Sequence, residues 1–162
     1  MAEDEPDAAK GVGVPPPVVY LGPLILGLLL NRRIQVPFLP WRSTRIIGLP
    51  LIGGGVLLGG WTFRTMRRAD TPVIGEPLVP DKPTTSLITD GPFRYSRNPG
   101  YFGAAMVYAG IASLTNVLWV FLLLPVVLLM MQRTAIEREE SYLEGNFGEE
   151  YLDYKARVRR WI

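Results

Sequence analysis

Three long stretches of the chain contain no charged residue: 11–31, 46–63 and 98–132. Together they make up nearly half of the 162 residues, although charged residues are 20% of the composition. A helix on the surface of a soluble domain needs a polar face toward water, so uncharged blocks of this length disfavour a soluble fold. The pattern instead predicts an all-α integral membrane protein.

The chain has no cysteine and no histidine. This excludes thiolate nucleophiles, disulfides, imidazole bases and zinc sites of the usual ligand types, and we expect no metal. Any chemistry must use carboxylates, Arg, Lys, hydroxyl groups, amides, backbone groups or a bound cofactor. The formal charge is only +2, and the basic residues flank the apolar blocks without interleaved aromatic residues. We therefore expect no nucleic-acid partner.

The first part of the chain divides into two regions. Residues 1–14 are expected to form a disordered acidic lead without the basic start of a signal peptide. Residues 15–66 are expected to hold two membrane helices, one at about 15–31 with a kink near Pro23 and one at about 46–65. Whether both helices cross the bilayer fully or are re-entrant stays open.

The second predicted helix contains small residues at helical spacing. Gly55 and Gly59 lie four positions apart, and lipid offers no hydrophobic drive for helix association. We therefore expect another helix to approach this face closely. The same face could support oligomerisation, and the oligomeric state stays open.

The uncharged block 98–132 is too long for one membrane helix. Its 35 residues would extend about 52 Å at about 1.5 Å per residue, against a hydrocarbon core of about 30 Å. A helical hairpin is therefore predicted, with helices at about 100–113 and 117–136 and a break at Ser113–Asn116. Asn116 is expected to cap the next helix.

The basic residues predict an orientation. With four spans and both ends inside, 13 Lys and Arg fall on the cytoplasmic side and four, in 32–45, on the other. The Pro-rich loop 64–97 and the charged tail from Arg133 then share the cytoplasmic face. The tail is expected to extend the last membrane helix, turn at Asn146–Gly148 and end in a short amphipathic helix. Trp161 suits a headgroup anchor or a solvated end.

The predicted hairpin brings two polar segments together. The start of the third helix, at Asn98–Tyr101, offers free backbone N–H groups suited to a carboxylate. The end of the fourth helix offers Glu137, Glu139 and Glu140, suited to an ammonium, a sulfonium or ribose hydroxyls. A ligand that carries both a carboxylate and cations would fit a cytoplasmic pocket between them. Solvated charges, a helix start and interface aromatics are the simpler interpretations of the same residues.

Two motifs in this region are recognisable. The run LITDGPFRYSRNPGYFG at 87–103 resembles the signature of the integral-membrane isoprenylcysteine carboxyl methyltransferase and phospholipid methyltransferase superfamily. The tail, with EESYL at 139–143, FGEEYLDY at 147–154 and VRR at 158–160, resembles the second half of that signature. The resemblance covers about 84–162 and assigns residues 67–162 as the methyltransferase core.

The resemblance implies a methyltransferase that depends on S-adenosylmethionine and has no Rossmann domain. It implies a set of cofactor-binding residues: Thr85, Ser86, Leu87, Ile88, Phe93, Asn98, Pro99, Gly100, Tyr101 and Glu139. It also implies that Arg97 and Glu140 are catalytic residues beside the cofactor. Which of the two adjacent glutamates contacts the cofactor stays open, because neighbours on a helix point about 100° apart.

The acceptor implied by the resemblance is a membrane lipid or another lipophilic small molecule, either similar to an isoprenylcysteine carboxylate or similar to a phospholipid amine. Transfer to O, N or S is left open. Members that act on isoprenylcysteine commonly have His where this chain has Asn98 and Arg where it has Ala135, so prenylcysteine specificity does not carry over. Direct transfer needs alignment and exclusion of water more than a strong acid or base. A non-catalytic scaffold or lipid-binding protein is the alternative, and a transporter is disfavoured because the predicted spans hold no ionisable residue.

Overall fold

The computed structural model describes residues 15–69 and 86–162. Every regular element in these two ranges is helical. The elements are α1 (Pro16–Arg33), α2 (Trp41–Arg68), the 3₁₀ turn η2 (Gly91–Arg94), α3 (Pro99–Thr115), α4 (Leu118–Met131), the π turn η3 (Gln132–Ile136), α5 (Glu137–Phe147) and α6 (Glu149–Arg157). The predicted acidic lead and most of the Pro-rich loop lie outside the described residues.

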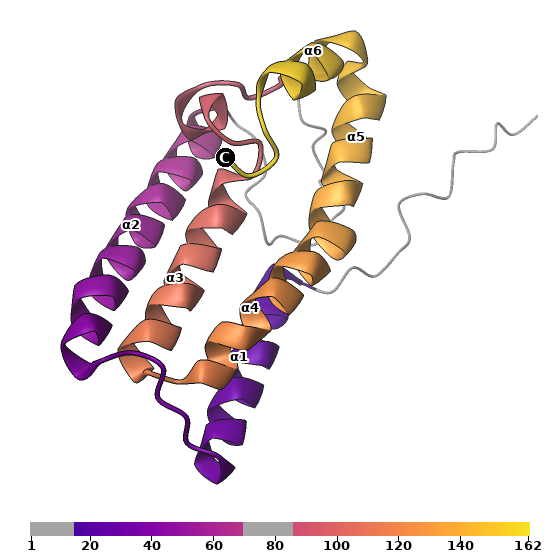
Figure 1. The fold of residues 1–162 in the computed structure, drawn as a ribbon. Coiled ribbons are helices and arrows are strands. Elements are labelled where there is room, and N and C mark those ends of the chain that lie inside the picture. Colours follow the sequence, from indigo (N-terminus) through magenta and orange to yellow (C-terminus); the bar gives the residue numbers. More distant parts are fainter. Residues whose placement is uncertain (1–14, 70–85) are drawn as a thin grey trace, which may run out of the picture.

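The four long helices lie side by side, with α3 between α2 and α4 (Figure 1). α2 packs along α3, while α1 packs mainly on α4 and only touches α3. The buried core joins α1, α3, α4 and η3. Its buried members are Val19, Tyr101, Tyr108, Ala112, Val117, Val120, Val127, Met131, Ala135 and Ile136.

Glycines allow α2 and α3 to approach with their backbones nearly in contact. A Cβ atom on Gly55 would lie 2.5 Å from the carbonyl oxygen of Gly103, and one on Gly110 would lie 2.9 Å from the carbonyl oxygen of Gly48. A Cβ atom on Gly103 would lie 3.2 Å from the backbone nitrogen of Gly59. The predicted close approach of a second helix at Gly55 and Gly59 is therefore confirmed, and α3 is that helix.

The α3–α4 hairpin turns at the predicted place, but Asn116 has another role than the one expected. It ends α3 in the left-handed conformation, with φ of 53°. Its side-chain oxygen accepts hydrogen bonds from the backbone N–H groups of Phe38 and Leu39, and its amide nitrogen donates to the carbonyl of Leu39. No side-chain hydrogen bond caps α4. Asn116 therefore joins the hairpin turn to the connection between α1 and α2.

Helix α2 begins at Trp41, five residues before its expected start, and ends at Arg68. The sequence places Arg42 and Arg45 in the connection 32–45, whereas in the structure they lie in the first turns of the helix. Long basic side chains at a helix end can reach the polar interface while their stems stay on the apolar surface. The guanidinium of Arg45 also lies 5.6 Å from the ring centroid of Trp41. The first residue of the uncharged block 46–63 therefore does not mark the start of helix α2.

The chain from α4 to α5 is one continuous helix that contains a π turn. The elements α4, η3 and α5 run on without interruption, and the helix ends at Gly148, which has φ of 50°. The turn and the short final helix agree with the prediction. A π turn inserts an extra residue and rotates the part of the helix beyond it, so the direction of the α5 side chains cannot be obtained from 100° per residue.

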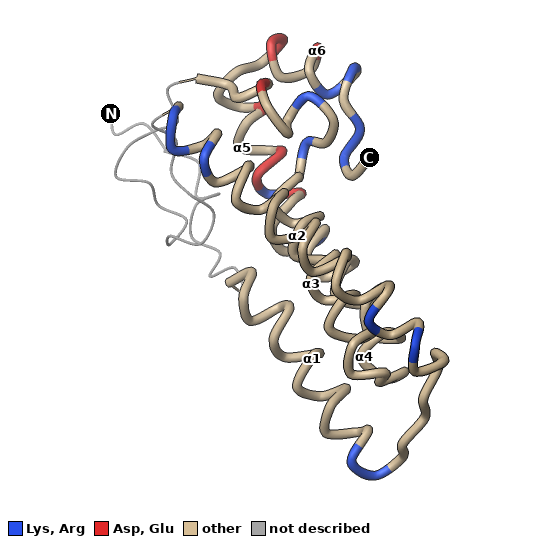
Figure 2. The backbone as a smooth tube through the Cα atoms, turned by 90° about the vertical axis from the view of Figure 1, so that its left-hand side faces the viewer, with Lys and Arg blue, Asp and Glu red and all other residues tan. Residues whose placement is uncertain are grey.

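Apolar surface covers the flanks of the bundle. Leu57 is 75% exposed and Ile46 is 71% exposed, and large exposed apolar side chains also cover α1 and α4. Lys and Arg lie at both ends of the bundle, and Asp and Glu lie at the end formed by α5 and α6 (Figure 2). Two helices among the described residues, Trp41–Arg68 and Leu118–Phe147, are long and apolar enough to cross a bilayer. These features indicate membrane association.

Candidate active site at the start of helix α3

The end of the bundle that carries α5 and α6 also holds the start of α3. Here the hydroxyl of Tyr101, in the first turn of α3, donates a 2.5 Å hydrogen bond to Oε1 of Glu139 in α5. Tyr101 is 3% exposed. The hydroxyl of Tyr20 in α1 donates to the carbonyl of Tyr101 at 2.8 Å. Three helices therefore meet at Tyr101.

The Glu139 carboxyl lies beyond the apolar part of its helix. Residues 137–140 read Glu-Arg-Glu-Glu, a sequence too charged for the hydrocarbon core. Burial raises the pKa of the Glu139 carboxyl to about 7, and the charge of Glu140 adds to the effect, while the hydrogen bond from Tyr101 acts in the opposite direction. Because no ion pair within the described ranges involves this carboxyl, it gains most from a cation brought by a ligand.

The neighbouring Glu140 is paired within the protein. Its side chain is 8% exposed and binds two guanidinium groups. Arg160 donates to it through Nε at 3.0 Å and Nη2 at 2.7 Å, and Nη2 of Arg97 lies 3.3 Å from Oε1. Nε and Nη1 of Arg97 are buried and have no hydrogen-bond partner in the described part of the chain. This three-residue cluster carries one net positive charge.

The C-terminal residues fold back over the start of α3. The backbone N–H of Arg97 donates to the carbonyl of Arg159 at 2.9 Å, and the carbonyl of Arg160 accepts from Asn98 Nδ2 at 3.0 Å and Ser96 Oγ at 3.3 Å. Trp161 is half-buried and packs against the hydrophobic core, so it does not belong to a fully solvated end, and the expected headgroup anchor stays a prediction. Asn98 occupies the N-cap position of α3, but its side chain holds this segment and makes no capping bond.

The other predicted cofactor residues surround the same end of the bundle. Pro99 is buried in the first turn of α3 and Gly100 is half-buried beside it. Phe93 lies in η2, where its carbonyl accepts a 2.8 Å hydrogen bond from the hydroxyl of Tyr154 in α6. Ser86 is exposed and Leu87 and Ile88 are half-buried in the loop before η2. Thr85 lies outside the described residues. The cofactor role of each of these residues stays a prediction.

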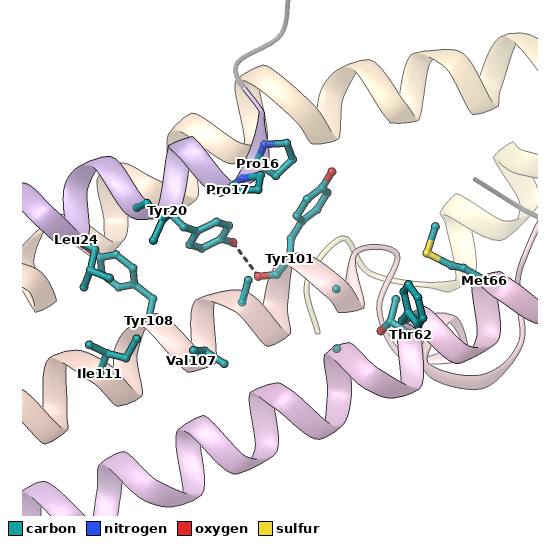
Figure 3. Close-up of a pocket in the computed structure, with 15 residues that line it drawn as sticks. Pro16, Pro17, Tyr20, Leu24, Thr62, Met66, Tyr101, Val107, Tyr108 and Ile111 are labelled. Carbon is teal, nitrogen blue, oxygen red and sulfur yellow. Dashed lines mark hydrogen bonds between the residues drawn. The ribbon is translucent and has the colours of Figure 1, made fainter. Parts of the chain in front are cut away.

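An apolar groove of about 550 Å³ runs from this site along α3. Its walls come from α1 and α2 and its floor from α3 (Figure 3). Pro16, Tyr20 and Leu24 of α1 lie opposite Thr62 and Met66 of α2. Gly100 and Tyr101 line the groove, so Tyr101 both borders the groove and contacts Glu139.

Similarity to known proteins identifies the family of the chain. The family model described as phospholipid methyltransferase matches residues 43–150, more than half of the chain. The chain belongs to the phospholipid methyltransferase family. A curated "Uncharacterized protein" from Haemophilus influenzae is 51% identical over 35 residues, 22% of this chain and 56% of that relative's length. No solved structure matches the chain.

The family identified by this match agrees with the resemblance found in the sequence, and the chain covers 56% of the length of the relative from Haemophilus influenzae. The matched region runs from α2 through α5 and contains the Tyr101–Glu139 pair. Ala135 is buried in the core at 8% exposure, whereas Arg133 is exposed and lies 3.9 Å from Glu137. Arg133 and Arg138 are the arginines nearest in sequence to position 135, where members that act on isoprenylcysteine commonly have arginine. Both are exposed, so neither occupies the buried position of the Ala135 side chain.

Two contributors to the site are not assigned by the sequence motifs. Arg160 belongs to the Val-Arg-Arg run that resembles the family, and that run is the signal that could have identified it. Tyr20 lies in an apolar helix outside the recognised motifs. Its hydroxyl contact with Tyr101 depends on how α1 packs, which no local pattern predicts.

Proposed function

We propose that the protein is a multi-pass membrane methyltransferase that uses S-adenosylmethionine and methylates a lipophilic acceptor. The observation that carries the proposal is the position of Tyr101, which borders the apolar groove and contacts the ionisable Glu139. Tyr101 therefore lies between an apolar groove, which suits a lipophilic acceptor, and a carboxyl, which suits a charged cofactor.

The charged groups at the site suit the two ends of an amino acid. Nε and Nη1 of Arg97 are buried and make no hydrogen bond among the described residues, although the hydroxyl of Tyr151 interacts with this guanidinium. The start of α3 has backbone N–H groups at Gly100 and Tyr101. These donors fit a carboxylate. Glu139 fits an ammonium, because pairing with a cation relieves the cost of ionising this half-buried carboxyl. Glu140 is already paired with Arg97 and Arg160, so we assign the cofactor contact to Glu139.

When bound, S-adenosylmethionine would supply a sulfonium methyl group for in-line transfer to an acceptor heteroatom, with the sulfur leaving as a neutral thioether. The residues of the chain align the two molecules and exclude water. Gly100 and Tyr101 line the groove, and Tyr101 also contacts Glu139. The reacting end of the acceptor would lie beside Tyr101, with its apolar part along α3. Arg97 would bind the carboxylate of the cofactor, and Glu140 would hold Arg97 in position through their ion pair. The transfer requires no strong base.

The groove is suited to a molecule that enters from the bilayer. The groove lies between α1 and α2, and both helices carry large exposed apolar side chains suited to contact with lipid. α1 and α3, with 18 and 17 residues, extend about 26 Å at about 1.5 Å per residue, close to the hydrocarbon thickness of about 30 Å. We therefore propose four spans, with the α5–α6 end in the cytoplasm as the distribution of basic residues favours.

A labelled methyl-transfer assay tests the proposal. Purified protein in nanodiscs of total membrane lipid receives S-adenosylmethionine with a labelled methyl group, and lipid extracts are examined for the label. We expect transfer by the wild type, and loss of transfer with unchanged cofactor binding in Ala104→Phe, which fills the groove. Leu57→Phe is the matched control, since Leu57 faces outward on α2. If the protein binds the cofactor but transfers no label to any lipid fraction, the acceptor is not a lipid. If it does not bind the cofactor, a non-catalytic scaffold is favoured.

A further inference from the structure

The segment 158–162, here called the C-terminal strap, connects the two elements that form the proposed cofactor site. Its backbone carbonyls accept hydrogen bonds from the residues just before α3, and the side chain of Arg160 binds Glu140 in α5. Arg160 takes part in both sets of contacts. The contacts span 62 to 64 positions of sequence on the α3 side and 20 on the α5 side.

The contact between Arg160 and Glu140 restrains helix α5, because it joins a residue of α5 to the strap. Glu139 and Glu140 are adjacent on the helix and point about 100° apart. Glu140 is held by two hydrogen bonds from Arg160 and by the ion pair with Arg97, and in this orientation of α5 Glu139 contacts Tyr101. A rotation of α5 that released Glu140 would also turn Glu139 away from α3.

The contacts of the strap backbone set the position of the α3 start. Asn98 donates to the carbonyl of Arg160, and Tyr101 comes three residues later on nearly the same face of the helix. A shift of the strap would therefore move Tyr101 relative to Glu139. Trp161 packs against the core and fixes the end of the strap.

We propose that Arg160 is a positioning residue that holds the start of α3 and helix α5 at the separation required for the Tyr101–Glu139 pair. The proposal rests on the proposed function in that this pair belongs to the same cofactor site. Arg160 itself acts through Asn98 and Glu140 and need not touch the cofactor.

The neighbouring residue provides a matched control. Arg159 is exposed, and its backbone carbonyl accepts the hydrogen bond from Arg97, a contact that Arg159→Ala retains. Arg160→Ala and Arg159→Ala remove the same charge from adjacent positions. Arg160→Lys keeps the positive charge at position 160 but loses the bidentate hydrogen bonding to Glu140.

Two measurements test the inference. The chain has no cysteine, so Arg94→Cys and Tyr142→Cys give two unique sites for spin labels, one before α3 and one on α5. We expect Arg160→Ala to broaden the distance distribution between the labels, Arg160→Lys to broaden it less, and Arg159→Ala to leave it unchanged. In the absence of labels, we expect Arg160→Ala to weaken S-adenosylmethionine binding about tenfold or more, and Arg160→Lys about threefold.

The distance measurement does not depend on the cofactor. If the wild type binds no S-adenosylmethionine but Arg160→Ala still broadens the distribution, the proposed function fails and the positioning role stands. If the distribution and the affinity of Arg160→Ala match those of Arg159→Ala, the inference is overturned. Should Arg160→Ala not fold, the comparison of Arg160→Lys with Arg159→Ala decides by the same two readouts.

Discussion

The hydroxyl of Tyr101 and the carboxyl of Glu139 form a 2.5 Å hydrogen bond between residues 38 positions apart. The bond joins the first turn of α3 to the charged helix that continues α4. Because Tyr101 also lines the apolar groove, the bond lies where the groove meets the polar end of the bundle. The chemistry proposed for the protein depends on this junction.

Cofactor binding should depend on the ionisation of Glu139. Its carboxyl has a pKa of about 7 in the free protein because of burial, and only the ionised form pairs with an ammonium. We expect the affinity for S-adenosylmethionine to fall by up to about tenfold per pH unit below pH 7 and to level off above it. Calorimetry between pH 5.5 and 8.5 measures this profile. An affinity that is constant across the range would contradict the assignment.

Tyr101→Phe should shift this profile to higher pH. The hydroxyl of Tyr101 stabilises the ionised carboxyl of Glu139, so its loss raises the pKa further. The phenyl ring keeps the wall of the groove in place. We expect the midpoint of the profile to rise, with weaker binding at pH 7 and a smaller difference at pH 8.5. A midpoint at the wild-type value would mean that the hydroxyl does not act on Glu139.

Substitutions of the two adjacent glutamates should differ in their effect on stability: loss of Glu140 should destabilise the protein, and loss of Glu139 should not. Glu140→Gln leaves Arg97 and Arg160 without their anionic partner in a largely buried cluster, and we expect a loss of about 2 kcal/mol in stability, roughly 4–8 °C in the unfolding temperature. Glu139→Gln should not lower the unfolding temperature at pH 8. The pKa of Glu139 lies above its ordinary value, so its ionisation destabilises the free protein as the pH rises through about 7. Thermal unfolding in detergent at pH 5 and pH 8 measures both effects, and equal losses in both variants would contradict the division of roles.

The close contact between α2 and α3 should make Gly55 intolerant of a side chain. Gly55→Ala places a Cβ atom 2.5 Å from the Gly103 carbonyl oxygen, and we expect a loss of about 1–3 kcal/mol. Gly53→Ala is the control, because a Cβ atom at Gly53 meets nothing within 4 Å. Unfolding of the two variants in the same detergent compares them directly. Similar stabilities would mean that the two helices are not packed as the structure describes.

The sequence predicts those features that depend on local chemistry. Uncharged blocks predict helices, the Ser-Thr-Asn cluster marks the turn before α4, and the glycine spacing marks the contact with another helix. The start of α2 at Trp41 is not predicted, because Arg42 and Arg45 resemble the end of the apolar region. Local pattern suggests only a cap for Asn116, since its partners Phe38 and Leu39 lie 78 and 77 positions away.

The functional roles of Glu139 and Glu140 cannot be separated from the sequence. They are adjacent in one charged run, and the π turn at Gln132–Ile136 changes the direction in which α5 presents them. The structure distinguishes them by their partners, which are Tyr101 for Glu139 and two arginines for Glu140. The partner Arg160 comes from a segment that only the folded chain brings to α5.

Calorimetric titration of S-adenosylmethionine into purified wild-type protein and Glu139→Gln at pH 8 tests the central claim most directly. The account predicts micromolar binding by the wild type and a loss of about 1.5–3 kcal/mol in Glu139→Gln, which corresponds to roughly 10–150-fold in Kd. Unchanged secondary structure in the variant, measured by circular dichroism, makes the loss specific to the site. A folded wild type that does not bind, or a Glu139→Gln variant that binds equally well, would contradict it.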